Sequence, residues 1–218
     1  MWISVKEYRR LSISCHFNQR VIKLLRLDIG GRFYSVYSGS QSIAFFLLPI
    51  SSNFESGNRN AMFRVGLISD THGLLRPEAK TFLRGCDFIV HGGDIGSPNI
   101  LKELSELAPV TAVRGNNDKA NWADELSLDE FLQLGDIFIY VIHDLADLQI
   151  DPLAAGVRVV VSGHSHIPGV RERDGVLFVN PGSSGPRRFK LPISIGELVV
   201  EGNSVSAHIH ELTMPPAA

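Results

Sequence analysis

Seven side chains that could bind metal ions stand in four short clusters and at one isolated histidine. The clusters are Asp70-Thr71-His72, Gly92-Gly93-Asp94, Gly115-Asn116-Asn117-Asp118 and Gly163-His164-Ser165-His166, and the isolated residue is His143. Carboxylates, imidazoles and an amide, without any thiolate, suit manganese, iron or zinc in a reactive site better than a structural zinc site. The sequence therefore indicates hydrolytic chemistry at a two-metal centre.

The spacing within the clusters favours shared ions. In an extended backbone, residues two apart project to the same side, so Asp70 and His72 would face one ion, and His164 and His166 repeat this spacing. The two glycines before Asp94 allow a tight turn at the end of a strand. A carboxylate placed there has two oxygens that can bridge neighbouring cations.

From residue 64 onward, short apolar runs alternate with helical stretches. The runs predict eight strands: Val65–Ser69, Phe88–His91, Val110–Arg114, Ile137–Ile142, Val157–Ser162, Val176–Asn180, Ile193–Val200 and Ser204–Glu211. Pro77 opens a helix that Gly85 ends, and Ser97-Pro98 opens a second helix. A third helix is predicted over Leu145–Ala155.

The order of these elements predicts an α/β fold with two mixed β-sheets packed together and flanked by helices. Strands and helices alternate early, and consecutive strands follow after about residue 157. Each of the first five predicted strands ends in one of the candidate ligand sites. Because ligand sites of open α/β sheets collect beyond the carboxyl ends of the strands, we expect the candidates to meet at one edge.

The ordered set D-x-H, G-G-D, G-N-x-D, a single His and G-H-x-H resembles the calcineurin-like metallophosphoesterase superfamily. The resemblance covers residues 62–218, and the loop Asn180-Pro181-Gly182-Ser183 is similar to that of the small YfcE-type phosphodiesterases. It implies a four-layer αββα sandwich. It also implies hydrolysis of a phosphate ester by a metal-bound hydroxide, with phosphodiesters expected ahead of phosphomonoesters.

The resemblance further implies which catalytic residues hold two divalent ions. The residues implied for the first ion are Asp70, His72, Asp94 and His166. The residues implied for the second ion are Asp94, Asn116, His143 and His164, so that Asp94 is the bridge. Manganese is the expected metal, and iron, nickel and zinc also suit these ligands.

Asn117 departs from the pattern of many relatives. They carry a histidine at this position, which contacts the phosphate and helps to protonate the leaving oxygen. An amide cannot act as an acid, so we expect activated phosphodiesters to react faster than alkyl phosphomonoesters. Substrate contacts are expected from Asn117, Arg187 and Arg188, with Lys190 in the same basic loop.

Three further histidines are expected to have other roles. His91 ends a predicted strand, and we interpret it as a structural residue or a support for the ligands. His208 and His210 repeat the spacing of a ligand pair, but they lie in the middle of a strand without a glycine turn. We therefore interpret them as one polar face of that strand.

Charge divides the chain at Met62. Residues 1–61 contain eight Lys or Arg and three acidic residues, whereas residues 62–218 contain 13 and 20. Met62 is followed at once by a buried-strand pattern, so residues 62–218 are predicted to be the metallophosphoesterase domain. Residues 1–61 are a basic extension, for which three interpretations stay open: a disordered or mis-annotated start, an organellar transit peptide, and a functional arm.

The cysteine content and the hydropathy of the chain indicate in which cell compartment to expect it. With only Cys15 and Cys86, no disulfide framework is expected, which favours the cytoplasm, or an organelle if the extension is a transit peptide. The apolar run 43–48 is far shorter than the ~20 residues of a membrane-spanning helix, so no membrane partner is expected.

The charge of residues 62–218 limits the partners to be expected. Because acidic side chains outnumber basic ones there, we do not expect this domain to bind a long nucleic acid. The expected partners are a small phosphate ester and a second copy in a homodimer.

A non-catalytic role is the alternative function. The retromer scaffold subunit resembles the same compact fold and uses it to bind proteins rather than for catalysis. Loss of ligand-competent residues would favour a scaffold. Because all seven candidate positions hold competent residues, we expect an enzyme.

Overall fold

The computed structural model describes residues 12–17, 20–25, 62–188 and 190–213. The chain divides into two compact units, Met1–Asn58 and Arg59–Ala218. In the first unit, strand β1 (Ser12–Phe17) pairs antiparallel with β2 (Arg20–Leu25). Most of residues 1–61 lie outside the described residues, so the interpretation of the basic extension and the boundary at Met62 stay predictions.

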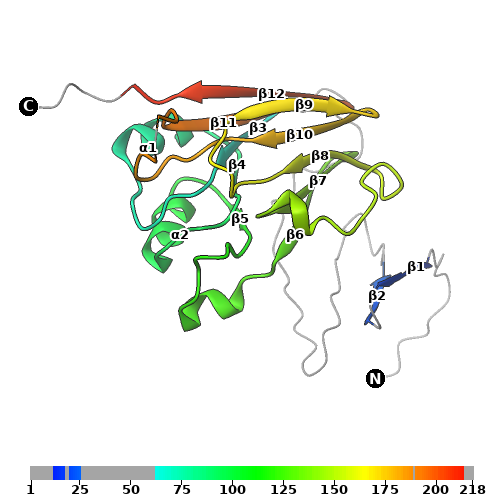
Figure 1. The fold of residues 1–218 in the computed structure, drawn as a ribbon. Helices are drawn as coiled ribbons and strands as arrows, with labels where there is room; N and C mark the ends of the chain where they lie inside the picture. The colour runs from blue at the N-terminus through cyan, green and yellow to red at the C-terminus, as the bar shows by residue number, and fades with distance from the viewer. Residues whose placement is uncertain (1–11, 18–19, 26–61, 189, 214–218) are drawn as a thin grey trace, which may run out of the picture. The chain divides into compact units, whose positions relative to one another are not determined.

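The second unit contains two five-stranded mixed sheets. In the first sheet, β3 (Met62–Ile68), β4 (Phe88–His91) and β5 (Val110–Ala112) run parallel to one another. Two C-terminal strands, β11 (Ser194–Glu201) and β12 (Ser204–Glu211), extend this sheet antiparallel beside β3. The strand order is β12-β11-β3-β4-β5 (Figure 1).

The second sheet is built from the middle of the chain. Its parallel strands are β7 (Ile137–Ile142), β8 (Val157–Val161) and β10 (Val176–Asn180). Each edge strand pairs antiparallel with its neighbour: β6 (Asp129–Leu134) with β7, and β9 (Gly169–Arg173) with β10. The order is β6-β7-β8-β10-β9.

A core of β-branched and leucine side chains lies between the two sheets. Val65 and Leu67 of β3 are fully buried in one cluster with Val159 and Val161 of β8. Alternate residues of each strand point into this layer, as expected for strands with one face in a core. Burial of this apolar surface stabilises the packing of one sheet on the other.

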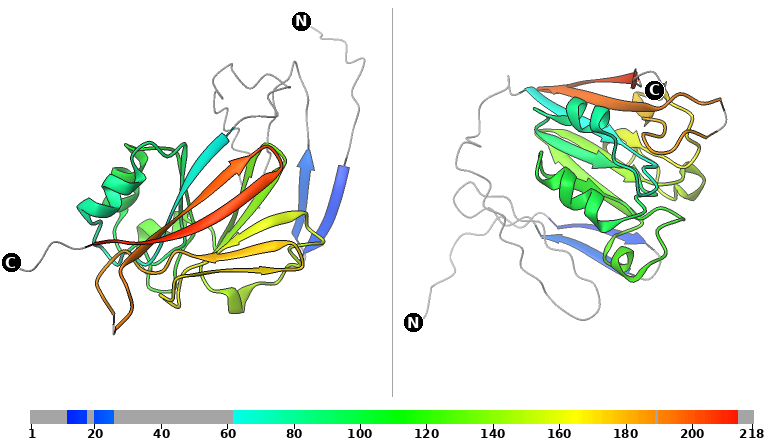
Figure 2. Two further views of the ribbon diagram at one scale, coloured as in Figure 1. Left: turned by 90° about the horizontal axis from the view of Figure 1, so that it is seen from above. Right: turned by 90° about the vertical axis from the view of Figure 1, so that its left-hand side faces the viewer.

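Two helices cover the outer face of the first sheet, α1 (Pro77–Leu83) and α2 (Pro98–Ser105). Both begin with proline, which is tolerated in the first turn of a helix because its missing N–H needs no partner there. Leu83 of α1 and Leu104 of α2 pack with Ile68 and Ile89 of the sheet. The helices lie on the side of this sheet that faces away from the second sheet (Figures 1 and 2).

The predicted fold class is confirmed, and one predicted helix is wrong. Leu145–Ala155 forms the 3₁₀ turn η2 (Leu145–Asp147) followed by irregular turns. Pro152 removes a backbone donor from this segment, and only Leu148 and Ile150 pack on the outer face of the second sheet. The outer layer on this side is therefore a turn-rich segment.

Two strands of the second sheet were not predicted. Both β6 and β9 are edge strands whose charged residues break the apolar run that marks a buried strand. A second 3₁₀ turn, η1 (Asn121–Glu125), precedes β6. None of the helices in the described ranges is long and apolar enough to cross a membrane.

Candidate metal centre

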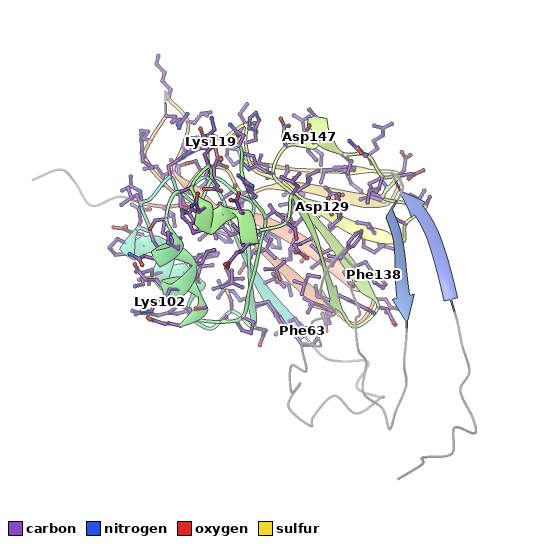
Figure 3. The ribbon with its side chains drawn as sticks, turned by 90° about the horizontal axis from the view of Figure 1, so that it is seen from below. Phe63, Lys102, Lys119, Asp129, Phe138 and Asp147 are labelled. Atoms are coloured by element: carbon purple, nitrogen blue, oxygen red, sulfur yellow. The ribbon has the colours of Figure 1, made fainter. Side chains whose placement is uncertain are left out.

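The carboxyl ends of five strands lead into the loops that carry the predicted ligands. These strands are β3, β4 and β5 of the first sheet and β7 and β8 of the second. In Figure 3, Lys119 and Asp147, from the loops after β5 and β7, lie toward one edge, and Phe63 near the start of β3 lies toward the opposite edge. Within each sheet these strands run parallel, so their carboxyl ends lie at the same edge of that sheet.

Backbone hydrogen bonds join these loops beyond the strand ends. The N–H of Asp70 donates to the carbonyl of Gly93 (3.0 Å), and the N–H of His72 donates to the carbonyl of Asp94 (2.9 Å). In the second sheet, the N–H of Gly163 donates to the carbonyl of His143 (2.9 Å). Neighbouring ligand loops are therefore held together by an extension of the strand pairing.

Five of the seven predicted ligands have a left-handed backbone conformation. Their φ angles are 53° at Asp70, 45° at His72, 54° at Asp94, 64° at His164 and 58° at His166. Residues other than glycine rarely adopt such angles, which cost on the order of 1–3 kcal/mol each. We predicted that an extended backbone directs Asp70 and His72 to one side, and His164 and His166 likewise. This prediction is wrong, because turns beyond the strand ends determine where these side chains point.

A first group of ligand atoms surrounds Asp70. Its Oδ1 lies 3.2 Å from Nε2 of His166 and 4.0 Å from Nε2 of His72. The two ring nitrogens are 3.4 Å apart, and the imidazole rings stack with centroids 5.3 Å apart. Three such atoms within 4.8 Å of one another could hold one metal ion.

A second group gathers around the amide oxygen of Asn116. This oxygen lies 3.0 Å from Nε2 of His143 and 3.1 Å from Nδ1 of His164. The Nδ1 of His143 lies 2.7 Å from the carbonyl of Gly92, which can only accept a hydrogen bond. In the neutral form of His143, the proton therefore lies on Nδ1, and the lone pair of Nε2 is directed at the group.

Asp94 lies between the two groups. Its Oδ2 is 3.7 Å from Nε2 of His72, and its Oδ1 is 3.5 Å from Nε2 of His143. A second set of three potential ligand atoms, from Asp70, Asp94 and His143, also lies within 4.8 Å. Asn117 holds this carboxylate: its N–H donates to Oδ1 (2.8 Å) and its Nδ2 donates to Oδ2 (2.6 Å).

The ligand atoms fit a divalent cation by a test that is independent of the motifs. Asp70 Oδ1 and His166 Nδ1 are buried, and neither has a hydrogen-bond partner among the described residues. Most buried polar atoms in proteins have such partners. Because Asp70 Oδ1 faces two imidazole nitrogens, a cation between them would satisfy this oxygen.

The protonation states also suit metal binding. Burial opposes ionisation of Asp70, but the imidazole of His166 and the hydroxyl of Ser69, which donates to Oδ2 at 2.6 Å, hold the pKa of this carboxyl below its ordinary value. For His72, burial lowers the pKa, and the charge of Arg188 adds to this effect against that of Asp94. The carboxylate and the neutral imidazole are the forms that bind metals.

Two supporting side chains were not singled out by the sequence reasoning. The buried carboxylate of Asp118 accepts hydrogen bonds from the N–H groups of Ile95, Gly96 and Gly115. The Nδ2 of Asn180 donates to the carbonyl of Gly163 at 2.6 Å. In the sequence, each is marked only by its place in a motif: Asp118 ends Gly115-Asn116-Asn117-Asp118, and Asn180 begins Asn180-Pro181-Gly182-Ser183.

The basic loop after β10 places one of its arginines beside the centre. Arg188 Nη2 lies 3.4 Å from Nε2 of His72. Arg187 and Lys190 are exposed, and among the described residues neither forms a hydrogen bond or ion pair with a predicted ligand. Of these three basic residues, Arg188 is therefore the one placed beside a proposed ligand.

His91, His208 and His210 lie outside both metal-binding groups. His91 is fully buried, with Nε2 3.0 Å from the hydroxyl of Thr71 and Nδ1 accepting from the N–H of Gly93. Burial lowers the pKa of His91 to about 4, so this imidazole is neutral. His210 pairs with Glu197 at 3.2 Å on the first sheet, and neither it nor His208 joins a potential metal group of the described residues.

Comparisons with known proteins agree with this geometry. Residues 63–203 match the family model of the calcineurin-like phosphoesterase superfamily domain. A "probable metallophosphoesterase" of Methanothermobacter thermautotrophicus is 35% identical over 157 residues, which are 66% of this chain and 90% of that protein.

Two solved structures are similar in fold. A structure described as a novel archaeal phosphodiesterase has a TM-score of 0.57 and 25% identity, covering 67% of this chain and 99% of that one. Vacuolar protein sorting 29 of Cryptosporidium parvum has a TM-score of 0.61 and 22% identity, covering 70% and 92%. At that identity, the second likeness concerns the fold alone.

Proposed function

Because the chain belongs to the calcineurin-like phosphoesterase superfamily, we propose that it is a two-metal-dependent enzyme that hydrolyses phosphodiesters. The observation that most supports two ions is the position of Asp94, whose two oxygens lie 3.7 and 3.5 Å from histidines of different ligand groups. The likeness to an archaeal phosphodiesterase supports the substrate class.

In this proposal, two ligand sets share one carboxylate. The first ion is held by Asp70, His72, Asp94 and His166. The second ion is held by Asp94, Asn116, His143 and His164. We propose manganese as the metal, and iron, nickel and zinc also suit nitrogen and oxygen ligands. Bound ions supply positive charge for the phosphate oxygens and lower the pKa of water.

Arg188 and Asn117 have separate roles in this proposal. The guanidinium of Arg188 lies beside His72 and would donate to a phosphate oxygen of the bound ester. Asn117 holds Asp94 through two hydrogen bonds and has no titratable proton. The leaving group therefore receives little proton assistance from this position, which favours esters whose leaving groups are weak bases.

A hydrolysis assay with matched esters tests the proposal. The metal-stripped full chain is supplied with Mn²⁺, Fe²⁺, Ni²⁺ or Zn²⁺ and given bis(p-nitrophenyl) phosphate, p-nitrophenyl phosphate or an alkyl phosphomonoester. We expect metal-dependent hydrolysis, fastest with the aryl diester and slowest with the alkyl monoester. Asn117→His should raise the rate with poor leaving groups relative to good ones.

Two outcomes would contradict the proposal. No hydrolysis with any of the metals would remove the enzymatic function and leave a binding role for the fold. Equal rates with leaving groups of widely different basicity, when chemistry limits the rate, would remove the argument from Asn117. Asp94→Ala and His166→Ala should abolish any true activity of the preparation.

A further inference from the structure

Asp144 follows the proposed ligand His143 directly, and its side chain reaches a different proposed ligand. One carboxylate oxygen, Oδ2, lies 3.4 Å from Nε2 of His164. The other oxygen, Oδ1, accepts a hydrogen bond from the N–H of Ala146 at 2.9 Å, because Asp144 is the N-cap of η2. The turn therefore fixes this carboxylate independently of His164.

The two ring nitrogens of His164 have different surroundings. Nδ1 lies 3.1 Å from the amide oxygen of Asn116, inside the second ligand group, whereas Nε2 faces Asp144. Both neighbours are hydrogen-bond acceptors, but the carboxylate is charged and is the stronger acceptor, so it favours the neutral tautomer with the proton on Nε2. That tautomer leaves the lone pair of Nδ1 directed into the ligand group.

His164 has less support from packing than the proposed ligands His143 and Asp70 have. Its side chain is 44% exposed, whereas that of His143 is 6% exposed and that of Asp70 is fully buried. The edge of the His143 ring contacts His164 on one side, with ring centroids 5.2 Å apart. The carboxylate of Asp144 is the polar contact that holds the opposite nitrogen.

We propose that Asp144 is a positioning residue that orients His164 as a metal ligand and thereby sets the affinity of the second site. This inference rests on the metal centre of the proposed function, but not on the reaction. Partners of metal-binding histidines typically contribute about 10- to 100-fold to metal affinity. Because the pair is partly exposed, we expect the lower end, about tenfold.

Calorimetric titration of the metal-stripped full chain with Mn²⁺ alone tests the inference without turnover. Asp144→Asn is a suitable variant because its side-chain oxygen can still accept from the N–H of Ala146 and keep the cap. We expect two binding events in the unmodified protein, of which Asp144→Asn weakens one about tenfold and leaves the other unchanged. Asp147→Asn, at an exposed carboxylate of the same turn, should change neither event.

The tautomer of His164 gives a readout that a purely structural role would not move. In nitrogen-15 spectra of the metal-free protein, we expect the proton on Nε2, and Asp144→Asn should shift the population toward Nδ1–H. Wild-type affinity for both ions in Asp144→Asn, equal weakening of both events, or an unchanged tautomer would each overturn the inference. If two ions bind as expected but no ester is hydrolysed, the proposed function fails and this inference stands.

Discussion

At the scale of single residues, the proposed ligands combine ordinary side chains with uncommon backbone angles. The close approach of two loops adds a requirement for glycine: a Cβ on Gly115 would collide with the backbone nitrogen and Oδ1 of Asp94. Only glycine leaves room for the carboxylate that lies between both ligand groups. The side chains of the site are therefore positioned by backbone geometry as much as by their own contacts.

Arg188→Ala should weaken catalysis more than Arg187→Ala does. Only Arg188 contacts a proposed ligand, and a charge-assisted hydrogen bond to phosphate is worth about 1.5–3 kcal/mol. We expect kcat/KM for the aryl diester to fall about 10- to 100-fold in Arg188→Ala and by less than about twofold in Arg187→Ala. Equal effects of the two substitutions on steady-state rates would argue against a specific phosphate contact.

The candidate ligand residues could be identified from the sequence, but the residues that support them could not. The four motifs are local, so residues such as Asp70 and His166 stand out in the sequence. The partners of Asp118 are backbone N–H groups, two of which lie more than 20 residues away at Ile95 and Gly96. No local pattern marks such contacts, and the left-handed angles of the ligands leave no compositional trace.

At the scale of elements, Asp118 fastens the loop after β4 to the loop after β5. Its Oδ2 accepts from the N–H groups of Ile95 (3.1 Å) and Gly115 (2.9 Å), and its Oδ1 accepts from the N–H of Gly96 (2.8 Å). These two loops carry Asp94 and Asn116. One buried carboxylate therefore couples the proposed bridge Asp94 to Asn116, a proposed ligand of the second ion.

Asp118→Asn should loosen both loops. An amide group can accept at only one of its two ends, so it faces at least one N–H donor with a donor of its own. We expect a loss of about 2 kcal/mol in the free energy of unfolding of the metal-free protein, measured with urea, together with weaker metal binding. Asp136→Asn, in the exposed turn between β6 and β7, is the control; equal stability of the two variants would contradict this role.

The elements that sequence patterns missed lie where apolar periodicity is weak. β9 carries Arg171, Glu172 and Arg173 at the edge of its sheet, so it lacks the apolar run of β7 or β8. A local signal was present all the same: Asp174 and Gly175 both have positive φ in the β9–β10 turn, and Asp-Gly is a typical hairpin pair. Buried strands were predictable because their apolar runs are continuous.

At the scale of the whole second unit, a polar network ties the outer face of the first sheet together. Arg64 of β3 donates from Nε to Glu197 of β11 at 2.7 Å and from Nη2 to the carbonyl of Phe82 at the end of α1. His210 of β12 lies 3.2 Å from the same glutamate. Three strands thus meet at the carboxylate of Glu197, and Arg64 links this pair to α1.

The stability conferred by Glu197 should depend on pH in acid. Burial opposes its ionisation, but the hydrogen bond and charge of Arg64, with His210, hold its pKa below the ordinary value of 4.5. A carboxyl whose pKa is lowered by folding stabilises the protein above its unfolded pKa and loses this contribution as pH falls through the folded value. The loss therefore begins near pH 4.5 and grows at lower pH.

Unfolding measured from neutral pH into acid, with chelator present, tests this dependence. Glu197→Gln should cost about 1 kcal/mol at neutral pH, and its difference from the unmodified protein should shrink below the unfolded pKa. Glu201→Gln, at an exposed position of the same strand, should change little at any pH. A difference for Glu197→Gln that stays constant into acid would show that its ionisation does not contribute.

The loops after five strands, from both sheets, bring the proposed ligands together around Asp94. The central claim is that two cations share this aspartate. The full chain, loaded with Mn²⁺ and freed of excess metal, is analysed for bound metal beside its Asp94→Ala variant. The account predicts two ions for each unmodified chain and fewer than one for Asp94→Ala. At most one ion in the unmodified chain, or two ions retained by Asp94→Ala, would contradict it.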